Sequence, residues 1–418
     1  MTKNNQINGS RAISRREYLG GTGLAAITGL AGCLGSASDS SQIRVGNLSP
    51  FSGTLGWIGP QSRRGVKTAL EGDEGVNSAT IDGRTIKVVE GDSETKPVPA
   101  IKAFRTLDEE NVKAMVGPSS AATPSLIRPA ITSRLSFVSP MSGTMQLDDI
   151  GGEYIWRTVP SDAIGARAQA KYAYQQRDAR KIALAYKNSQ GSYSFSKASG
   201  DFFSYLGGTV VAEVELQPGA DSYREEVRAI QERGPDAISM TAGSSVTSQF
   251  ISDHVAANAD SDLLLGNDVL TEDFIQEVGS DVMEGMVGQS PAPGPANDVF
   301  VDQYSGVNDG EPGAFSAPAY DAMNLIALAF VKEGEANRNA VPNHLSDLGN
   351  PPGEKVSTFA AGKEALEAGK EINYVGAANP QNFNVRGDVL GSFAVLEASG
   401  DTWEQVKRYE SADLEKSE

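Results

Sequence analysis

A regular alternation of short apolar runs with longer helical patterns is the feature of this sequence that most restricts its fold. In the first part of the chain the strand-like runs lie at 43–48, 86–89, 114–116 and 137–139, and the helical patterns between them at 61–71, 99–110 and 123–133. This alternation is typical of βαβ units, in which each helix returns the chain so that the next strand runs parallel to the last. We therefore expect a parallel sheet with helices packed on it.

A second alternating series begins after a crossing strand expected at 154–158. Its helices and strands, by turns, are expected at 162–176, 182–186, 195–206, 209–215, 223–232, 237–241, 247–258 and 263–266. Two separate series predict an α/β protein with two doubly wound lobes, each built on its own parallel sheet.

The last third of the chain predicts further crossings between these lobes. A strand at 286–289 runs into the proline-rich stretch 290–295, which suits a connector because proline lacks an N–H donor and fixes φ. An apolar helix is expected at 317–331, weaker helices at 342–348 and 358–368, and a strand pair at 393–396 and 403–406. The expected domains are lobe 1 at 43–160 and 291–380, lobe 2 at 161–290 and 381–408, and an acidic tail at 409–418.

Charge and composition exclude several classes of function. The chain carries a net charge of −18, although its first 32 residues are basic, so the remainder is a poor partner for nucleic acid. With two histidines and one cysteine, a multi-ligand zinc site or a disulfide framework is not expected. We therefore expect no metal, no cofactor and no nucleic-acid partner.

The N-terminal 33 residues have the pattern of an export signal followed by a lipid anchor. Arg15 and Arg16 precede an aromatic residue and a leucine, as in a twin-arginine signal, and the apolar stretch that follows is too short and glycine-rich to span a bilayer. It ends at Leu30-Ala31-Gly32-Cys33, which resembles a lipobox whose thiol accepts a lipid. We expect a signal peptide at 1–33, a flexible polar tether at 34–42 and a protein anchored to the outer surface of the cell membrane by its lipid alone.

The body of the chain, from about 43 to 406, resembles the leucine/isoleucine/valine-binding protein family of extracytoplasmic solute receptors. The resemblance depends on six segments that occur in order with suitable spacings. They are Leu48-Ser49-Pro50-Phe51-Ser52-Gly53, Val116-Gly117-Pro118-Ser119-Ser120, Val138-Ser139-Pro140, Trp156-Arg157-Thr158-Val159-Pro160-Ser161-Asp162, Ala319-Tyr320-Asp321-Ala322 and Phe383-Asn384-Val385-Arg386-Gly387-Asp388. The resemblance implies the type I periplasmic binding fold, an amino acid, amide or small carboxylate bound between two closing lobes, and the permease and ATPase subunits of an ABC importer as partners.

Ser119 and Ser120 are the first candidate ligand-binding residues. They follow a predicted strand and precede a predicted helix, where hydroxyls and helix N-terminal N–H groups can hold an anion. A plain helix cap is the alternative interpretation, and the resemblance does not choose between the two serines. In the next loop a gapless count puts Gly143 where the family usually has a threonine, so Ser142, Thr144 or the backbone alone could contribute.

Further candidates come from an aromatic residue and from the second series. Trp57, beside two glycines, is expected in the cleft rather than in a core. Asp268 follows the strand at 263–266, where the resemblance implies an acid that pairs with the ligand ammonium, and Asp162 is either a second acid or a helix cap. The family's tyrosine falls on Gly191 by count, with Tyr193 two residues later, and Gly243 replaces a frequent aromatic. These departures predict a remodelled pocket for the ligand side chain.

Two other classes of function were weighed. Neither histidine follows a predicted strand, and no nucleophile elbow, P-loop or H-E-x-x-H motif occurs, so the sequence does not favour an enzyme. A pair of carboxylates acting as in a glycosidase stays open from the sequence. A ligand-sensing receptor module at the cell surface would use the same fold and is the main alternative to transport.

Overall fold

The computed structural model describes residues 42–414 of the chain. The expected signal with Arg15 and Arg16, the lipobox Cys33, the tether up to residue 41 and the last four residues lie outside the described part. Between residues 42 and 414, the structure contains no helix with the length and apolar character needed to cross a membrane.

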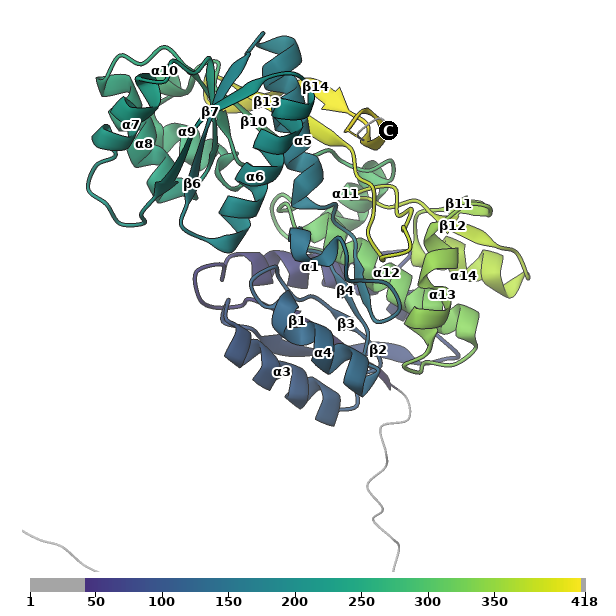
Figure 1. Ribbon diagram of the computed structural model, residues 1–418. Coiled ribbons are helices and arrows are strands. Elements are labelled where there is room, and N and C mark those ends of the chain that lie inside the picture. Colours follow the sequence, from purple (N-terminus) through teal and green to yellow (C-terminus); the bar gives the residue numbers. More distant parts are fainter. Residues whose placement is uncertain (1–41, 415–418) are drawn as a thin grey trace, which may run out of the picture. The chain divides into compact units, whose positions relative to one another are not determined.

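The first series of elements forms a five-stranded sheet in which every strand is parallel to its neighbours (Figure 1). Its strands, in spatial order, are β2 (Thr85–Asp92), β1 (Gln42–Ser49), β3 (Met115–Val116), β4 (Phe137–Ser139) and β5 (Ile155–Arg157). The central strands are buried on both faces, which is why they read in the sequence as continuous apolar runs rather than as alternating patterns.

Helices cover both faces of this first sheet. Leu48 and Phe137 pack on one face with α3 (Pro97–Glu109) and α4 (Thr123–Ser133). Val45 and Val138 pack on the other face, against a larger group of helices. That group consists of α1 (Ile58–Glu71), α2 (Val76–Ala79), α11 (Asn297–Val307), α12 (Ser316–Glu333), α13 (Ala340–Gly349) and α14 (Phe359–Glu367), together with a two-stranded sheet of β11 (Glu354–Val356) and β12 (Ile372–Tyr374). We call this sheet and its helices the first lobe.

The helix α12 is the centre of the first lobe. It is buried on nearly all sides, as expected of a helix that is apolar all round. It ends where Gly334 adopts a left-handed conformation with φ of 75°, which suits a glycine at the end of a helix. Because α12 is buried along most of its length, its first two turns have a fixed position in the first lobe.

The second series forms a seven-stranded sheet. In spatial order its strands are β14 (Thr402–Tyr409), β13 (Phe393–Ser399), β10 (Val287–Pro291), β9 (Asp262–Leu265), β8 (Ala237–Thr241), β6 (Lys181–Lys187) and β7 (Thr209–Leu216). The five strands from β10 to β7 are parallel, and β13 and β14 extend the sheet as an antiparallel pair.

Helices again cover both faces of the second sheet. One face packs against α5 (Asp162–Gln176), α6 (Gln190–Tyr205) and the short helix η3 (Ser411–Leu414). The other face packs against α7 (Arg224–Gln231), α8 (Ser244–Ala256), α9 (Glu272–Val278) and α10 (Ser280–Met283). We call this sheet and its helices the second lobe, and the predicted pair of doubly wound lobes is confirmed.

The chain changes cores at slightly different places from those that the pattern suggested. Phe383 and Val389 pack in the core of the first lobe, and the strands of the second sheet resume at Phe393. At the C-terminal end, Tyr409 and Leu414 are buried in the second lobe, because the short helix η3 lies against α5. The sequence pattern predicted an acidic tail at 409–418 and did not identify these two residues as buried.

Candidate functional site

A cavity of about 550 Å³ lies where loops from the two lobes meet. Its walls include the residues that follow β3, β4 and β5 of the first sheet and those that follow β9 and β10 of the second. Ligands of open α/β sheets bind at these carboxyl ends of strands, so the cavity is the candidate site on topological grounds.

The structure brings five of the eight predicted ligand-binding residues to this cavity. Those that line it are Trp57, Ser119, Ser120, Asp162 and Asp268. The other three, Ser142, Thr144 and Tyr193, are not among the residues that line it.

Ser119 and Ser120 contribute hydroxyls rather than helix N–H groups. The helix α4 begins at Thr123, three residues beyond Ser120, and the N–H of Ser120 already donates to the carbonyl of Met141 at 3.3 Å. The N–H of Thr123 likewise donates to the carbonyl of Ser119. The Ser119 Oγ is buried and has no hydrogen-bond partner among the described residues. A buried hydroxyl without a partner is costly, so this atom is suited to a ligand group.

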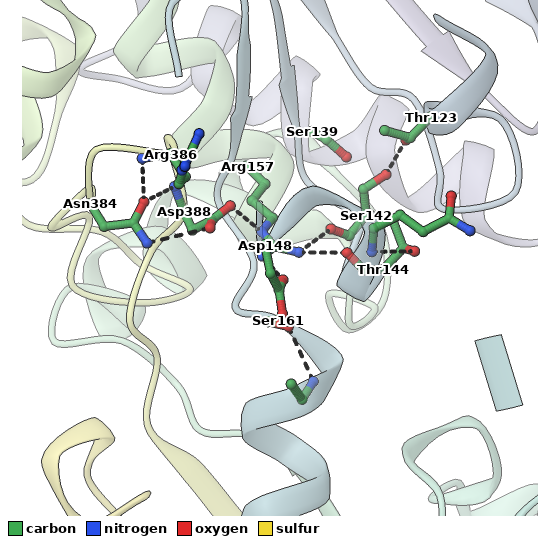
Figure 2. Close-up of polar contacts among 12 residues, drawn as sticks. Thr123, Ser139, Ser142, Thr144, Asp148, Arg157, Ser161, Asn384, Arg386 and Asp388 are labelled. Carbon is green, nitrogen blue, oxygen red and sulfur yellow. Dashed lines mark hydrogen bonds and ion pairs between the residues drawn. The ribbon is translucent and has the colours of Figure 1, made fainter. Parts of the chain in front are cut away.

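The loop after β4 presents its glycine to the cavity. The Ser142 Oγ turns inward and donates to the carbonyl of Pro118 at 2.9 Å. It also contacts the Thr123 hydroxyl (Figure 2). The Thr144 hydroxyl accepts a hydrogen bond from the N–H of Gln146 and caps the short helix η1 (Met145–Leu147). Both side chains therefore have local roles, and of residues 142–144 only Gly143 lines the cavity, together with Met141 earlier in the loop.

Asp162 lies directly against Gly143. Its backbone N–H donates to the Gly143 carbonyl at 2.7 Å, and a Cβ atom at residue 143 would come within 2.1 Å of the Asp162 Oδ1. Ser161, rather than Asp162, caps the helix α5 with its hydroxyl, so the Asp162 carboxylate is available to the cavity. This residue is partly accessible, but desolvation by the surrounding protein raises the pKa of its carboxyl group to about 6. The charge of Arg157 lowers this pKa, and the charges of Asp148 and Asp268 raise it further.

Asp268 contributes an acid from the second lobe. It lies after β9 in the short helix η2 (Asn267–Val269) and has an exposed side chain. Desolvation by the walls of the cavity raises its pKa, whereas hydrogen bonds from its own N–H and that of Gly243 and the nearby charge of Lys187 lower it. The side chain reaches water, and water stabilises the ionised carboxylate against the effect of desolvation.

Of the two aromatic residues predicted to contact the ligand, only Trp57 lines the cavity. Trp57 is half exposed, lines the cavity and packs against Phe315 with ring centroids 5.7 Å apart. Tyr193 lies on α6, because that helix begins five residues earlier than the pattern predicted, and its ring packs edge-on against Tyr186 at 5.5 Å. It is exposed on the surface of the second lobe.

Sequence reasoning missed much of the cavity wall. The missed residues include Phe195, Asn267, Gln289, Phe300, Phe315 and Asn379. Gln289 and Asn379 are buried, and each has a side-chain oxygen without a hydrogen-bond partner among the described residues. The proline-rich stretch 290–295, which begins within β10, was the available signal, because four of its residues line the cavity in addition to connecting the lobes.

A buried ion-pair network supports the loop that faces the cavity (Figure 2). Arg157, at the end of β5, pairs with Asp148 at 2.6 Å and with Asp388 at 2.7 Å. Its guanidinium also donates to the carbonyls of Ser142 and Thr144. Two of the six segments that suggested the family, 156–162 and 383–388, thus meet at one side chain. This network fixes the Ser142–Thr144 backbone and with it the position of Gly143.

A second buried group, which we call the Asp321 junction, organises the opposite part of the wall. Asp321 on α12 accepts hydrogen bonds from the N–H groups of Ala377 and Ala378, both at 2.8 Å. It also accepts from the Tyr374 hydroxyl at 3.0 Å and from the Gln381 side chain at 3.2 Å. Burial raises the pKa of Asp321 to about 7, and the four donors act in the opposite direction. Four donors and no acceptor suit the ionised carboxylate.

The Asp321 junction connects two of the crossings between the lobes, those at 158–161 and 292–296. The carbonyl of Ala377 accepts from the N–H of Gly294 at 2.8 Å, which links the segment that Asp321 holds to the crossing at 292–296. The Asn379 side chain donates to the carbonyl of Thr158 at 3.2 Å, which links the same segment to the crossing at 158–161. Ala377, Ala378 and Asn379 line the cavity, so the junction sets the position of part of its wall.

Two parallel-sheet lobes, several crossings and a cavity at their strand ends define a two-lobed solute receptor. Residues 42–364 match the family model of the periplasmic binding proteins. The chain therefore belongs to the periplasmic binding protein family, in its leucine/isoleucine/valine-binding, type I branch. Proteins of this family bind solutes outside the cytoplasm.

Two curated relatives match most of the chain. BasB, the substrate-binding protein of a chemotactic signal transduction system in Halobacterium salinarum, is 27% identical over 382 residues, which cover 88% of this chain and 89% of that protein. The leucine-, isoleucine-, valine-, threonine- and alanine-binding protein of Pseudomonas aeruginosa is 21% identical over 329 residues, which cover 77% of this chain and 87% of that protein.

Solved structures show the same fold. The leucine-binding protein LivK of Thermotoga maritima superposes with a TM-score of 0.73 at 20% identity, covering 89% of this chain and 99% of that chain. A solute-binding protein of an ABC transporter from R. palustris, solved in complex with 4-hydroxybenzoate, superposes with a TM-score of 0.68 at 17% identity, covering 89% of this chain and 98% of that chain. The predicted type I periplasmic binding fold is thereby confirmed.

Proposed function

We propose that this protein binds a small amino-acid-like solute in the cavity and delivers it to the permease and ATPase subunits of an ABC importer. The observation that carries the proposal is the pairing of unlike polar groups across the cavity. Ser119 and Ser120 come from the first lobe, and Asp268 comes from the second. Hydroxyls suit a carboxylate and a carboxylate suits an ammonium, so a zwitterion can contact both lobes at once.

The relatives support this proposal and widen the range of solutes to test. The Pseudomonas aeruginosa relative is named for five amino acids, and a protein of the same fold was solved with an aromatic acid. Isothermal titration of residues 34–418 against amino acids, their amides and small carboxylates, including 4-hydroxybenzoate, is the direct test. We expect saturable binding of at least one amino acid. Absence of binding across the whole panel would contradict the proposed role.

Replacing Asp268 with asparagine is expected to weaken the binding of zwitterions selectively. A charge-assisted hydrogen bond contributes about 1.5–3 kcal/mol, which corresponds to roughly ten- to a hundredfold in affinity. Titration calorimetry of the wild type and Asp268→Asn with an amino acid, and with a ligand of similar size that lacks the ammonium, measures this difference. Equal losses for both ligands would remove Asp268 from the ammonium site.

Sensing is a second candidate function, favoured by the similarity to BasB, which belongs to a chemotactic signal transduction system. The two functions differ in the partner that receives the loaded protein. A deletion strain should lose uptake of the labelled solute if the protein serves an importer. Loss of the behavioural response with unchanged uptake would instead favour the sensing role.

The lipid anchor is also a proposal, because Cys33 lies outside the described residues. We expect Cys33→Ala to move the protein from the membrane fraction to the soluble extracytoplasmic fraction, since a thiol is needed to accept the lipid. Fractionation followed by immunoblotting measures the shift, and Ser36→Ala in the neighbouring tether is the matched control. If both variants stay with the membrane as firmly as the wild type, Cys33 is not the anchor.

A further inference from the structure

The charged groups that line the cavity are all acidic. Among the described residues of its wall, Asp162 and Asp268 carry charge, and the wall contributes no lysine, arginine or histidine. The remainder of the wall is made of apolar and neutral polar residues, including five aromatic rings. Apolar walls reduce the screening of charge, so two carboxylates act on a bound solute more strongly than they would on an open surface.

Of the two cations nearest to these acids, Arg157 is engaged elsewhere and Lys187 lies near Asp268. Arg157, which acts on Asp162, forms its ion pairs with Asp148 and Asp388. Lys187 acts on Asp268, and both groups lie close to the place where a Cβ on Gly243 would stand. The local set of four acids and two cations leaves an excess of negative charge at the cavity.

One of the two acids stands beside the hydroxyls that are suited to a ligand carboxylate. The loop of Gly143, which Asp162 touches, is joined to Ser119 and Ser120 through backbone pairing of both serines with Met141. A carboxylate bound at these hydroxyls is therefore repelled by Asp162, while a cationic group nearby is attracted. Neutral hydroxyls compensate this repulsion only in part, because they carry no positive charge.

The aromatic rings of the wall favour a cation as well. Trp57 and Phe315 lie in contact with a tilt of 51° between their planes, and half of the Trp57 surface is exposed. The face of an aromatic ring attracts an ammonium group within about 6 Å, and tryptophan does so most strongly. Carboxylates and aromatic rings that line one cavity are complementary to an amine carried on an apolar body.

We propose that the cavity selects amine-bearing solutes, for which a positive charge is required and a carboxylate is dispensable. This inference depends on the proposed function in one respect, namely that the cavity is the solute site. It goes further in naming the chemical class, an ammonium on an aliphatic or aromatic body. Carboxylic acids without an amine are excluded by charge rather than by size.

The test uses two matched sets of probes that differ in charge but share a body. L-Leucinamide, L-leucine and 4-methylpentanoate form the aliphatic set, and L-phenylalaninamide, L-phenylalanine and 3-phenylpropanoate form the aromatic set. Titration calorimetry at pH 7, where most of each amine is protonated, gives the dissociation constants. In at least one set, we expect the amide to bind as tightly as the amino acid or more tightly, and the acid to bind at least about tenfold more weakly.

Variants separate the charge of the cavity from its shape. Asp162→Asn should weaken the amide by about tenfold and strengthen the acid, because it removes one charge without changing the size of the side chain. Asp253→Asn is the matched control, since Asp253 is a buried acid of the second lobe that accepts the Tyr223 N–H and does not line the cavity. It should leave the order of affinities unchanged.

The outcomes distinguish the inference from the function on which it depends. If an acid binds as tightly as its amino acid, or an amino acid binds at least tenfold more tightly than its amide, the inference fails and the proposed function stands. Unchanged affinities in Asp162→Asn would also overturn it. If none of the six probes binds, both the inference and the amino-acid-like function fail.

Discussion

Replacing Arg157 with methionine is expected to lower the free energy of unfolding by about 3–5 kcal/mol, because it leaves buried carboxylates without their partner. The Arg157 side chain is 1% exposed and that of Asp388 is 9% exposed. Burial raises the pKa of Asp388, and Arg157 opposes that rise. Without the guanidinium the carboxyl gains stability by taking up a proton, so the loss should shrink as the pH is lowered.

Urea unfolding followed by circular dichroism measures this loss as a lower transition midpoint with an unchanged slope. Arg44→Met is the matched control. Arg44 pairs with Glu110 at 2.6 Å, but their side chains are 35% and 48% exposed, so we expect a loss of at most about 1 kcal/mol. Similar losses in both variants would show that the Arg157 network contributes no more than an exposed ion pair.

Replacing Trp57 with phenylalanine is expected to abolish most of the change in tryptophan fluorescence that a bound solute produces. A solute that contacts both lobes favours their closure, since its affinity differs between the open and closed forms. Trp57 lines the cavity and is half exposed, so closure should bury it. Trp156 is buried and donates to the Glu153 carbonyl, and Trp403 donates to the Thr271 carbonyl, so both should respond less.

Fluorescence titration with the tightest-binding solute of the panel measures this effect, and Trp403→Phe is the control that should retain the change. Binding itself should persist in Trp57→Phe, because phenylalanine keeps an aromatic face in the wall. Small-angle scattering should show a slightly smaller radius of gyration at saturation. Identical scattering with and without the solute would contradict closure, whichever residues contact the ligand.

Local sequence patterns predicted the elements of the fold because most of them carry their own boundary signals. The helix at 123–133 and the strand at 137–139 coincide with α4 and β4, and Pro124 marks the helix start. The helix α6 was placed too late, although Ser189 caps it by accepting from the N–H of Ser192. The first turn of this helix has weak apolar periodicity, so the pattern did not indicate where the helix begins. For the same reason it did not place Tyr193 on the helix.

The residues of the cavity were harder to predict, because loops have no periodicity that fixes the direction of a side chain. The position of Ser119 and Asp268 at the ends of strands was a sufficient signal. For the loop of Ser142, spacing alone could not show that hydrogen bonds to Pro118 turn this side chain inward. Phe315 lies at the start of α12, far in sequence from the predicted residues of the wall. Only the packing of the first lobe places it at the cavity.

The Asp321 junction has a consequence for the use of this protein as a scaffold for a biosensor. Because one carboxylate holds Ala377 and Ala378, while Ala377 is bonded to Gly294 and Asn379 to Thr158, that part of the wall should move as one body with α12. A reporter dye attached near residues 377–379 would then sense little when a solute arrives. A dye on the rim near Asp268, which belongs to the second lobe, would move relative to that part of the wall when the lobes close, and substitutions there would change the choice of solute without loosening the Asp321 junction.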